Sequence, residues 1–215
     1  KLQRLSAGGE LWLAARGTQL QRAALRVHAP QLRLNYAERE PVTLDDVAFN
    51  AFFAAKDDGL HAQIDSLALS HGEQRLGEVH LALDGSGDSE QRQWKLAADR
   101  IDLAAWTPLV QALAPMPEAA REAVAALAPK GGVSNLHLDF RPALSGPERL
   151  QFAANLEQVG FSAYHGAPAA ENVSGSISGD LQQGELRLNT EDFALHLDHF
   201  FPEPWRYRHA QARLA

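Results

Sequence analysis

The stretch Leu60-His61-Ala62-Gln63-Ile64 alternates between apolar and polar residues, and Leu136-His137-Leu138-Asp139-Phe140 and Leu186-Arg187-Leu188 repeat the pattern. Successive side chains of a β-strand point to opposite faces, so each stretch predicts a strand with one apolar and one polar side. The alternation continues through most of the 215 residues. We therefore expect a mainly β protein, with a long curled antiparallel β-sheet that presents a continuous apolar face.

The expected strands follow one another as hairpins. Asp57-Asp58-Gly59 is a turn sequence, because its glycine tolerates the positive φ that tight turns need, and residues 85–90 form a polar, glycine-rich loop. In chain order, the alternating stretches are 10–16, 24–28, 31–36, 47–56, 60–70, 75–84, 94–101, 133–141, 150–158, 173–181, 185–189, 193–198 and 205–214.

The period of the pattern changes in the middle of the chain. Helical spacing relates Leu103, Trp106, Leu109, Val110 and Leu113. Asp102 is placed to cap this helix, and we expect Pro108 to kink or restart it. A second helix is predicted from about Pro117 to Ala128, with Gly131 and Gly132 after its end.

This order predicts one β-groove segment over 1–215, with strands over 1–101, a helical insertion over 102–130 and strands over 131–215. No strand–helix–strand rhythm is present, so a parallel doubly wound sheet is not expected. About a dozen strands at ~4.8 Å spacing would make a sheet ~60 Å across, and two short helices could cover only part of it. Either the sheet closes into a sandwich or barrel, or part of the apolar surface stays available.

The composition narrows the function further. The net charge of −7 gives no reason to expect a nucleic-acid partner. The chain has no cysteine, so disulfides and thiol chemistry are excluded. It contains no apolar run of the roughly 18–20 residues that a membrane span requires, and no signal peptide. Because it starts at Lys1 without an initiator methionine, we expect an internal piece or mature product of something longer.

Three motifs that suggest chemistry have simpler explanations. In His196-Leu197-Asp198-His199, alternation places His199 on the opposite face from His196 and Asp198, so we expect no metal site. Ser174–Gly179 is glycine-rich but lacks the ending of a phosphate loop, and its glycines mark a bend or bulge, or the close approach of another backbone or a ligand, with sheet curvature favoured over ligand contact. Asp45-Asp46 and Asp57-Asp58 are interpreted as solvated residues flanking turns. We therefore expect no catalytic residue, no cofactor and no enzyme activity.

The region 96–215 resembles a known family. The residues that carry the resemblance are Leu96–Leu103, Gly131–Leu136, Arg149–Phe152 and Asn172–Gly179, and the preceding strands fit the same pattern. Together they look like the YhdP family of AsmA-like, bridge-like lipid-transfer proteins from Gram-negative bacteria. The resemblance covers nearly the whole chain and rests on the texture and order of the sequence.

The resemblance implies a periplasmic segment of a protein that an N-terminal helix, absent here, anchors in the inner membrane. Its β-groove would carry phospholipid acyl chains toward the outer membrane, so the expected partners are phospholipid, the rest of the parent chain and, through that helix, the inner membrane. The predicted groove lining is Leu11, Leu13, Phe49, Phe53, Ile64, Leu81, Leu83, Leu96, Leu138, Phe140, Phe152, Leu156, Ile177, Leu186, Leu188, Leu195 and Leu197. Trp106, Leu109 and Leu113 are candidates for a gate or a cap.

Two alternatives remain open from the sequence. The same leucines and phenylalanines could contact one another in a closed β-sandwich, a scaffold or interaction module of an envelope protein with no lipid path, since alternation cannot separate a filled core from a lipid groove. An enzyme, such as a carbohydrate-active β-protein, would need convergent carboxylates on a concave surface, and none can be assembled from the sequence.

Overall fold

The structure is a computed structural model that describes residues 2–34, 42–56, 59–72, 74–88, 91–113, 118–197, 201 and 203–215. Within these ranges, the side chains of residues 2–7, 56, 74, 112 and 113 are not described. Asp57, Asp58, Pro117, Asp198 and His199, which carried sequence predictions, lie outside the described residues.

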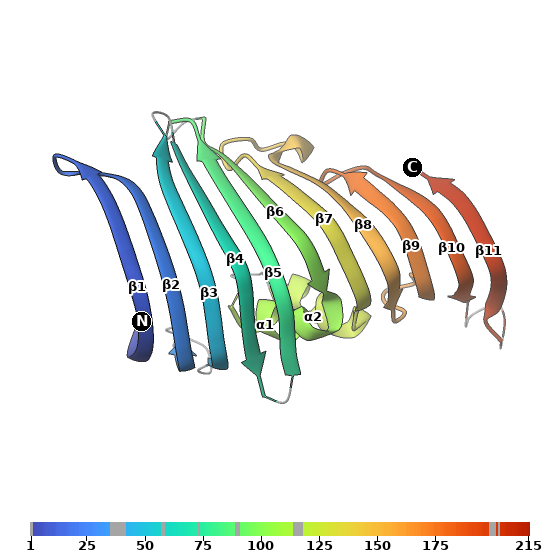
Figure 1. Cartoon of the computed structure of the whole chain (residues 1–215). Coiled ribbons are helices and arrows are strands. Elements are labelled where there is room, and N and C mark those ends of the chain that lie inside the picture. The colour runs from blue at the N-terminus through green and yellow to red at the C-terminus, as the bar shows by residue number, and fades with distance from the viewer. Residues whose placement is uncertain are drawn as a thin grey trace. The chain divides into compact units, whose positions relative to one another are not determined.

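Eleven strands form one antiparallel sheet in the order of the chain, without closing into a barrel (Figure 1). Two helices interrupt the strands after residue 102, so the predicted fold class is confirmed. The elements are β1 (Leu2–Arg16), β2 (Gln19–Leu34), β3 (Val42–Lys56), β4 (Gly59–His71), β5 (Gln74–Ser86), β6 (Gln93–Asp102), α1 (Leu103–Leu113), α2 (Glu118–Leu127), β7 (Lys130–Phe140), the short 3₁₀ helix η1 (Pro147–Arg149), β8 (Leu150–Phe161), β9 (Ala169–Gly179), β10 (Gly184–His196) and β11 (Trp205–Leu214).

Contacts between Cα atoms divide the chain into two compact units. The first unit contains residues 1–99 and 137–150, and the second contains 100–136 and 151–215. Each unit is described by itself below. That the whole chain acts as one groove segment stays a prediction.

Several strands are longer than the sequence pattern predicts. The stretches 24–28 and 31–34 belong to the single strand β2, and 185–189 and 193–196 belong to β10. Strand β3 begins at Val42, so Asp45-Asp46 lies inside a strand; its interpretation as a turn-flanking pair was wrong. The alternation changes phase at each of these places, and the change imitates the end of a strand.

The phase changes coincide with β-bulges. Asp46, for example, has a φ of 50°, and the pairing of β3 with β4 shifts register between Asp45 and Ala48. A bulge adds one residue to one strand and moves the following side chains to the other face. Inside six strands, a residue other than glycine adopts such a positive φ: Asp46, Ser66, Asn135, Gln158, Asn172 and Asp192.

The bulges keep the apolar side chains on one face. In β8, apolar residues occupy even positions through Leu156 and odd positions from Val159, with Gln158 between them. In β10, the same change separates Leu188 from Phe193. All four side chains nevertheless belong to one packed cluster, so the bulges realign the sequence with the apolar face.

Side chains satisfy backbone groups near the bulges of the second unit. The Thr190 hydroxyl donates to the carbonyl of Asn172, whose side-chain amide donates to the carbonyl of Asp192 at 3.0 Å. The backbone N–H of Gln158 donates to the Ser174 hydroxyl at 2.9 Å. Backbone groups displaced from the ladder need such partners, because a buried polar group without a hydrogen bond is costly.

The core lies along the apolar face of each unit. In the first unit, the buried hydrophobic residues are Ala29, Val42, Leu44, Val47, Leu69, Leu76, Val79 and Ala98. In the second unit, Val159, Ala170 and Val173 form a buried cluster against which Leu103, Leu156, Phe161, Leu188, Phe193 and Leu195 pack.

Both helices occupy the predicted ranges to within one residue. The Asp102 carboxylate accepts a hydrogen bond from the backbone N–H of Ala105 at 3.0 Å and so caps α1. Pro108 lies inside the continuous helix α1, so it does not restart the helix. After α2, Ala128 takes the left-handed conformation with a φ of 43°, whereas Gly131 and Gly132 already belong to β7.

We predict that Thr190→Val destabilises the chain by about 1–3 kcal/mol, because it keeps the branched shape and removes the donor to the Asn172 carbonyl. Thr190 is 3% exposed, so water cannot easily replace the hydroxyl. The free energy of unfolding in urea provides the measurement. Thr190→Ser, which keeps the hydroxyl, should lose less stability than Thr190→Val, and the reverse order would contradict the bulge-satisfying role.

Candidate functional site: an apolar sheet face

One face of the first unit is apolar across six strands. Residues paired across an antiparallel sheet share a face, so the register identifies the side chains that lie together. One row, from β1 to β6, is Leu11, Leu25, Ala51, Ile64, Leu81 and Ala98. The neighbouring row is Leu13, Ala23, Phe53, Ala62, Leu83 and Leu96. Phe49 joins the same face opposite Val27.

A side-chain hydrogen bond places Leu138 and Phe140 on this face. Gln93 donates to both carboxylate oxygens of Asp139, at 2.8 and 2.6 Å, so these two residues lie on the same, polar side of β6 and β7. Their neighbours in the strands therefore point to the opposite side. Phe140 and Leu138 thus share the apolar face with Trp94 and Leu96.

The second unit has a corresponding apolar face. Ile177 pairs with both Ala154 and Leu186, and Gly175 pairs with both Leu156 and Leu188. Phe152 pairs with Gly179, two residues from Ile177 along β9. Leu195 packs on the cluster that also contacts Leu156 and Leu188. Leu197 follows the end of β10 and is half-buried.

None of the predicted lining residues is fully buried. Leu11 and Leu13 are 59% and 61% exposed. The remaining members are half-buried: Phe49, Phe53, Ile64, Leu81, Leu83, Leu96, Leu138, Phe140, Phe152, Leu156, Ile177, Leu186, Leu188, Leu195 and Leu197. The apolar face is thus only partly covered by protein. Whether these residues contact lipid stays a prediction.

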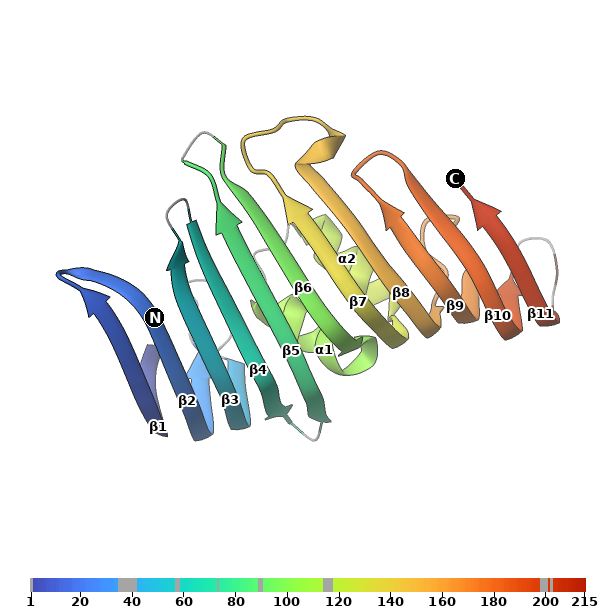
Figure 2. The same ribbon diagram turned by 45° about the horizontal axis from the view of Figure 1, so that its top comes forward.

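The helical pair is attached to the apolar face of the second unit. Leu103 of α1 packs on the cluster of β8 and β9, and Leu109 is 3% exposed. The carbonyl of Leu127, at the end of α2, accepts a hydrogen bond from the backbone N–H of Ser162 at 2.7 Å (Figure 2 shows both helices). Whether the helices gate or cap the apolar face stays a prediction. Trp106 is half-buried, and the side chain of Leu113 lies outside the described part of the structure.

The opposite face carries cross-strand polar pairs. His61 Nδ1 lies 2.9 Å from Asp84 Oδ1, and His80 Nδ1 lies 2.8 Å from Asp99 Oδ2. The hydrogen bond to Asp99 raises the pKa of His80 above its ordinary value of 6.5. Arg26 pairs with Glu10 at 3.3 Å in the same manner. This face is therefore the solvated side of the sheet.

The motifs with possible chemistry take structural roles. His196 Nε2 lies 3.1 Å from Glu171 Oε1, and no group of three or more potential metal ligands occurs among the described residues. Gly175 has a φ of 150°, and a Cβ atom there would stand 1.9 Å from the carbonyl oxygen of Arg187. Glycine is thus required at position 175 because β10 approaches closely there. The sequence left this explanation open among others.

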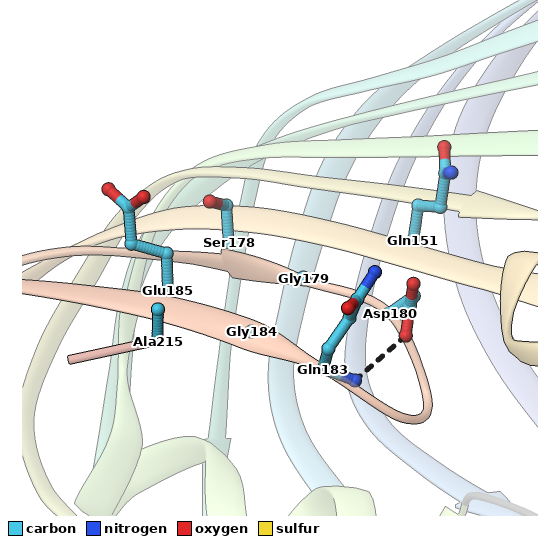
Figure 3. Close-up of a pocket in the computed structure, with 8 residues that line it drawn as sticks. All are labelled: Gln151, Ser178, Gly179, Asp180, Gln183, Gly184, Glu185 and Ala215. Atoms are coloured by element: carbon cyan, nitrogen blue, oxygen red, sulfur yellow. Dashed lines mark hydrogen bonds between the residues drawn. The ribbon is translucent and has the colours of Figure 1, made fainter.

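A hollow of about 430 Å³ lies at the β9–β10 hairpin (Figure 3). Ser178 and Glu185 in its wall pair with each other and alternate with Ile177 and Leu186, so it opens on the polar face. The carboxylate of Asp180 accepts hydrogen bonds from the backbone N–H groups of Gln182 and Gln183, which lower its pKa. These bonds stabilise the turn, and the hollow is separate from the apolar face.

The sequence prediction missed the most buried part of the face. Val42, Leu44, Leu69, Leu76 and Val159 lie across a change of phase from the predicted residues of their strands, whereas Val79 and Val173 share the phase of Leu81 and Ile177. The signal that could have located the first five is a polar pair at which the alternation changes from even to odd positions, as at Asp45-Asp46 and Glu157-Gln158.

These features define a class of protein: a mainly β protein whose single antiparallel sheet is not closed into a barrel and keeps a partly covered apolar face. The family model described as YhdP protein matches residues 1–215, and the chain therefore belongs to the YhdP protein family. No curated protein and no solved structure matches the chain. Among the described residues, no helix is long and apolar enough to cross a membrane.

We predict that Leu109→Ala lowers the free energy of unfolding by about 2–4 kcal/mol, because it leaves a cavity under α1. The adjacent residue Val110, which is 41% exposed, supplies the matched control. Val110→Ala should change the stability by less than about 0.5 kcal/mol in the same urea titration. Equal losses for the two variants would contradict the attachment of α1 through Leu109.

We predict that the His80 imidazole titrates above 6.5, and that Asp99→Asn moves its pKa downward. A raised pKa in the folded state means that the pair stabilises the fold below the unfolded value and loses this contribution as the pH rises through the folded value. An NMR titration of the His80 ring measures its pKa in the unmodified chain and in the Asp99→Asn variant. A His80 pKa at or below 6.5 in the unmodified chain would exclude the effect.

Proposed function

We propose that this chain is a segment of a periplasmic lipid-transfer conduit. Its apolar face would carry phospholipid acyl chains between the inner and outer membranes, while the headgroups remain in water. The observation that carries the proposal is the two apolar rows that cross β1–β6 in register, in which Leu11 and Leu13 are exposed and most other side chains are half-buried. Membership of the YhdP protein family supports the same function.

The physical basis is transfer of hydrocarbon between two apolar surroundings. Each methylene group that leaves water for an apolar surface gains about 0.8 kcal/mol, so a groove lowers the cost of moving an acyl chain out of a membrane. The partly covered leucine and phenylalanine side chains would be shielded by the same contact. The mechanism is therefore passive and needs no catalytic residue.

The alternative of a β-sandwich scaffold has less support. The described strands belong to one sheet, whereas a sandwich requires two. The sheet is also not closed into a barrel. An interaction module that uses the apolar face to bind protein would give a different result in the experiment below.

Two adjacent phenylalanines allow a matched test. Phe53 lies on the apolar face, and Phe52, which is 38% exposed, points to the polar face. We predict that a benzophenone amino acid at position 53 crosslinks to phospholipid in cells that make the full-length protein, and that the same group at position 52 does not. Mass spectrometry of the crosslinked species identifies the lipid.

Equal lipid labelling at positions 52 and 53 would refute a face-specific path. Crosslinks from position 53 to protein alone would favour the interaction module. Both substitutions introduce the same larger aromatic side chain, so the yield of folded protein serves as the common control.

A further inference from the structure

Two aromatic rings stand at the same end of the apolar face of the first unit. Trp94 lies one residue from the start of β6, and Phe140 is the last residue of β7. The hydrogen bonds between Gln93 and Asp139 place these strand ends next to each other. The Trp94 ring covers Gly85, where an added Cβ atom would come within 2.6 Å of the ring. The rings therefore form one lip of the apolar face.

An arginine side chain lies over each ring. The guanidinium carbon of Arg92 lies 5.9 Å from the centre of the Trp94 ring, and that of Arg149 lies 5.4 Å from the centre of the Phe140 ring. A cation above an aromatic face within about 6 Å is attracted by the ring. Stacking leaves the edge of a guanidinium, with its N–H donors, available to another group.

The two stacked arginines lack carboxylate partners within the part of the chain that the structure describes. Neither Arg92 nor Arg149 forms an ion pair there, and both are exposed. Arg141, at the same end, differs because it pairs with Asp139 at 3.2 Å. Burial disfavours the ionised form of Asp139, but the hydrogen bonds from Gln93 and Arg141 outweigh this and lower its pKa. The Asp139 carboxylate thus already has hydrogen-bond partners, and Arg92 and Arg149 supply the positive charge at the lip.

We propose that Arg92 and Arg149 bind the phosphate of a phospholipid headgroup whose acyl chains lie on the apolar face beside Trp94 and Phe140. The inference rests on the proposed function and adds the headgroup contact to it. Guanidinium groups bind phosphate through paired, charge-assisted hydrogen bonds. A cationic lip joined to an apolar face matches a ligand that combines an anionic phosphate with hydrocarbon, and neither half alone accounts for both features.

The test compares two lipids that share their acyl chains. Dioctanoylphosphatidylglycerol carries the phosphate, and dioctanoylglycerol lacks it. Displacement of a hydrophobic dye from the chain measures the affinity for each lipid. In the double variant Arg92→Gln/Arg149→Gln, we expect the affinity for the phospholipid to fall about fivefold or more and that for dioctanoylglycerol to stay unchanged.

A control variant removes the same charge elsewhere. Arg22 and Arg208 are exposed and form no ion pair with a described residue, and Arg22 lies next to Ala23 of the apolar face and so points away from it. Arg22→Gln/Arg208→Gln should keep the affinity for the phospholipid within about twofold. A loss equal to that of the Arg92 and Arg149 variant would mean that net charge alone matters and would overturn the proposal.

The outcomes separate this inference from the proposed function. Unchanged affinity of the Arg92 and Arg149 variant for both lipids overturns the headgroup site and leaves the acyl groove intact. Failure of the unmodified chain to bind either lipid refutes the groove itself. Displacement of the phospholipid by inorganic phosphate at equal concentration would assign the arginines to free phosphate and would also overturn the headgroup site.

Discussion

A sheet with one apolar face must keep its alternation in phase along every strand. In β8 and β10, however, the apolar positions change from even to odd numbers partway along the strand. A regular strand would therefore place the two sets of apolar side chains on opposite faces. The bulges at Gln158 and Asp192 absorb the change. The side chains of Leu156 and Val159 consequently reach the same cluster, and the rest of the apolar face depends on this correction.

The apolar face contains two environments. In the first unit, Val42, Leu44 and Val47 are buried, whereas Phe49 and Phe53, farther along β3, are half-buried. Protein atoms thus cover the apolar side chains of one part of the strand, and those of the other part stay accessible to another apolar surface. The helices do the same in the second unit, where Leu103 covers the cluster of β8 and β9. The face combines a core that stabilises the sheet with a region of apolar side chains that protein atoms cover only in part.

Much of the fold could be predicted from the alternation. The mainly β class, the consecutive hairpins and the N-cap at Asp102 follow from local patterns. The ends of β2, β3, β8 and β10 could not, because a change of phase looks like a loop when pairing partners are unknown. For the candidate site, parity placed Phe53, Leu83 and Leu96 on one face, as the register shows. Parity could not identify Arg92 and Arg149, because the two rings over which they lie come together only when β6 and β7 pair.

The hydrogen bonds around Asn172 have a consequence for folding. A hairpin sheet can misalign by one or two residues, and a simple alternating pattern penalises the two-residue error weakly. Here such an error would separate Thr190 from the carbonyl of Asn172, and the Asn172 amide from the carbonyl of Asp192. These hydrogen bonds therefore make the observed register of β9 and β10 more stable than a register that is shifted by two residues.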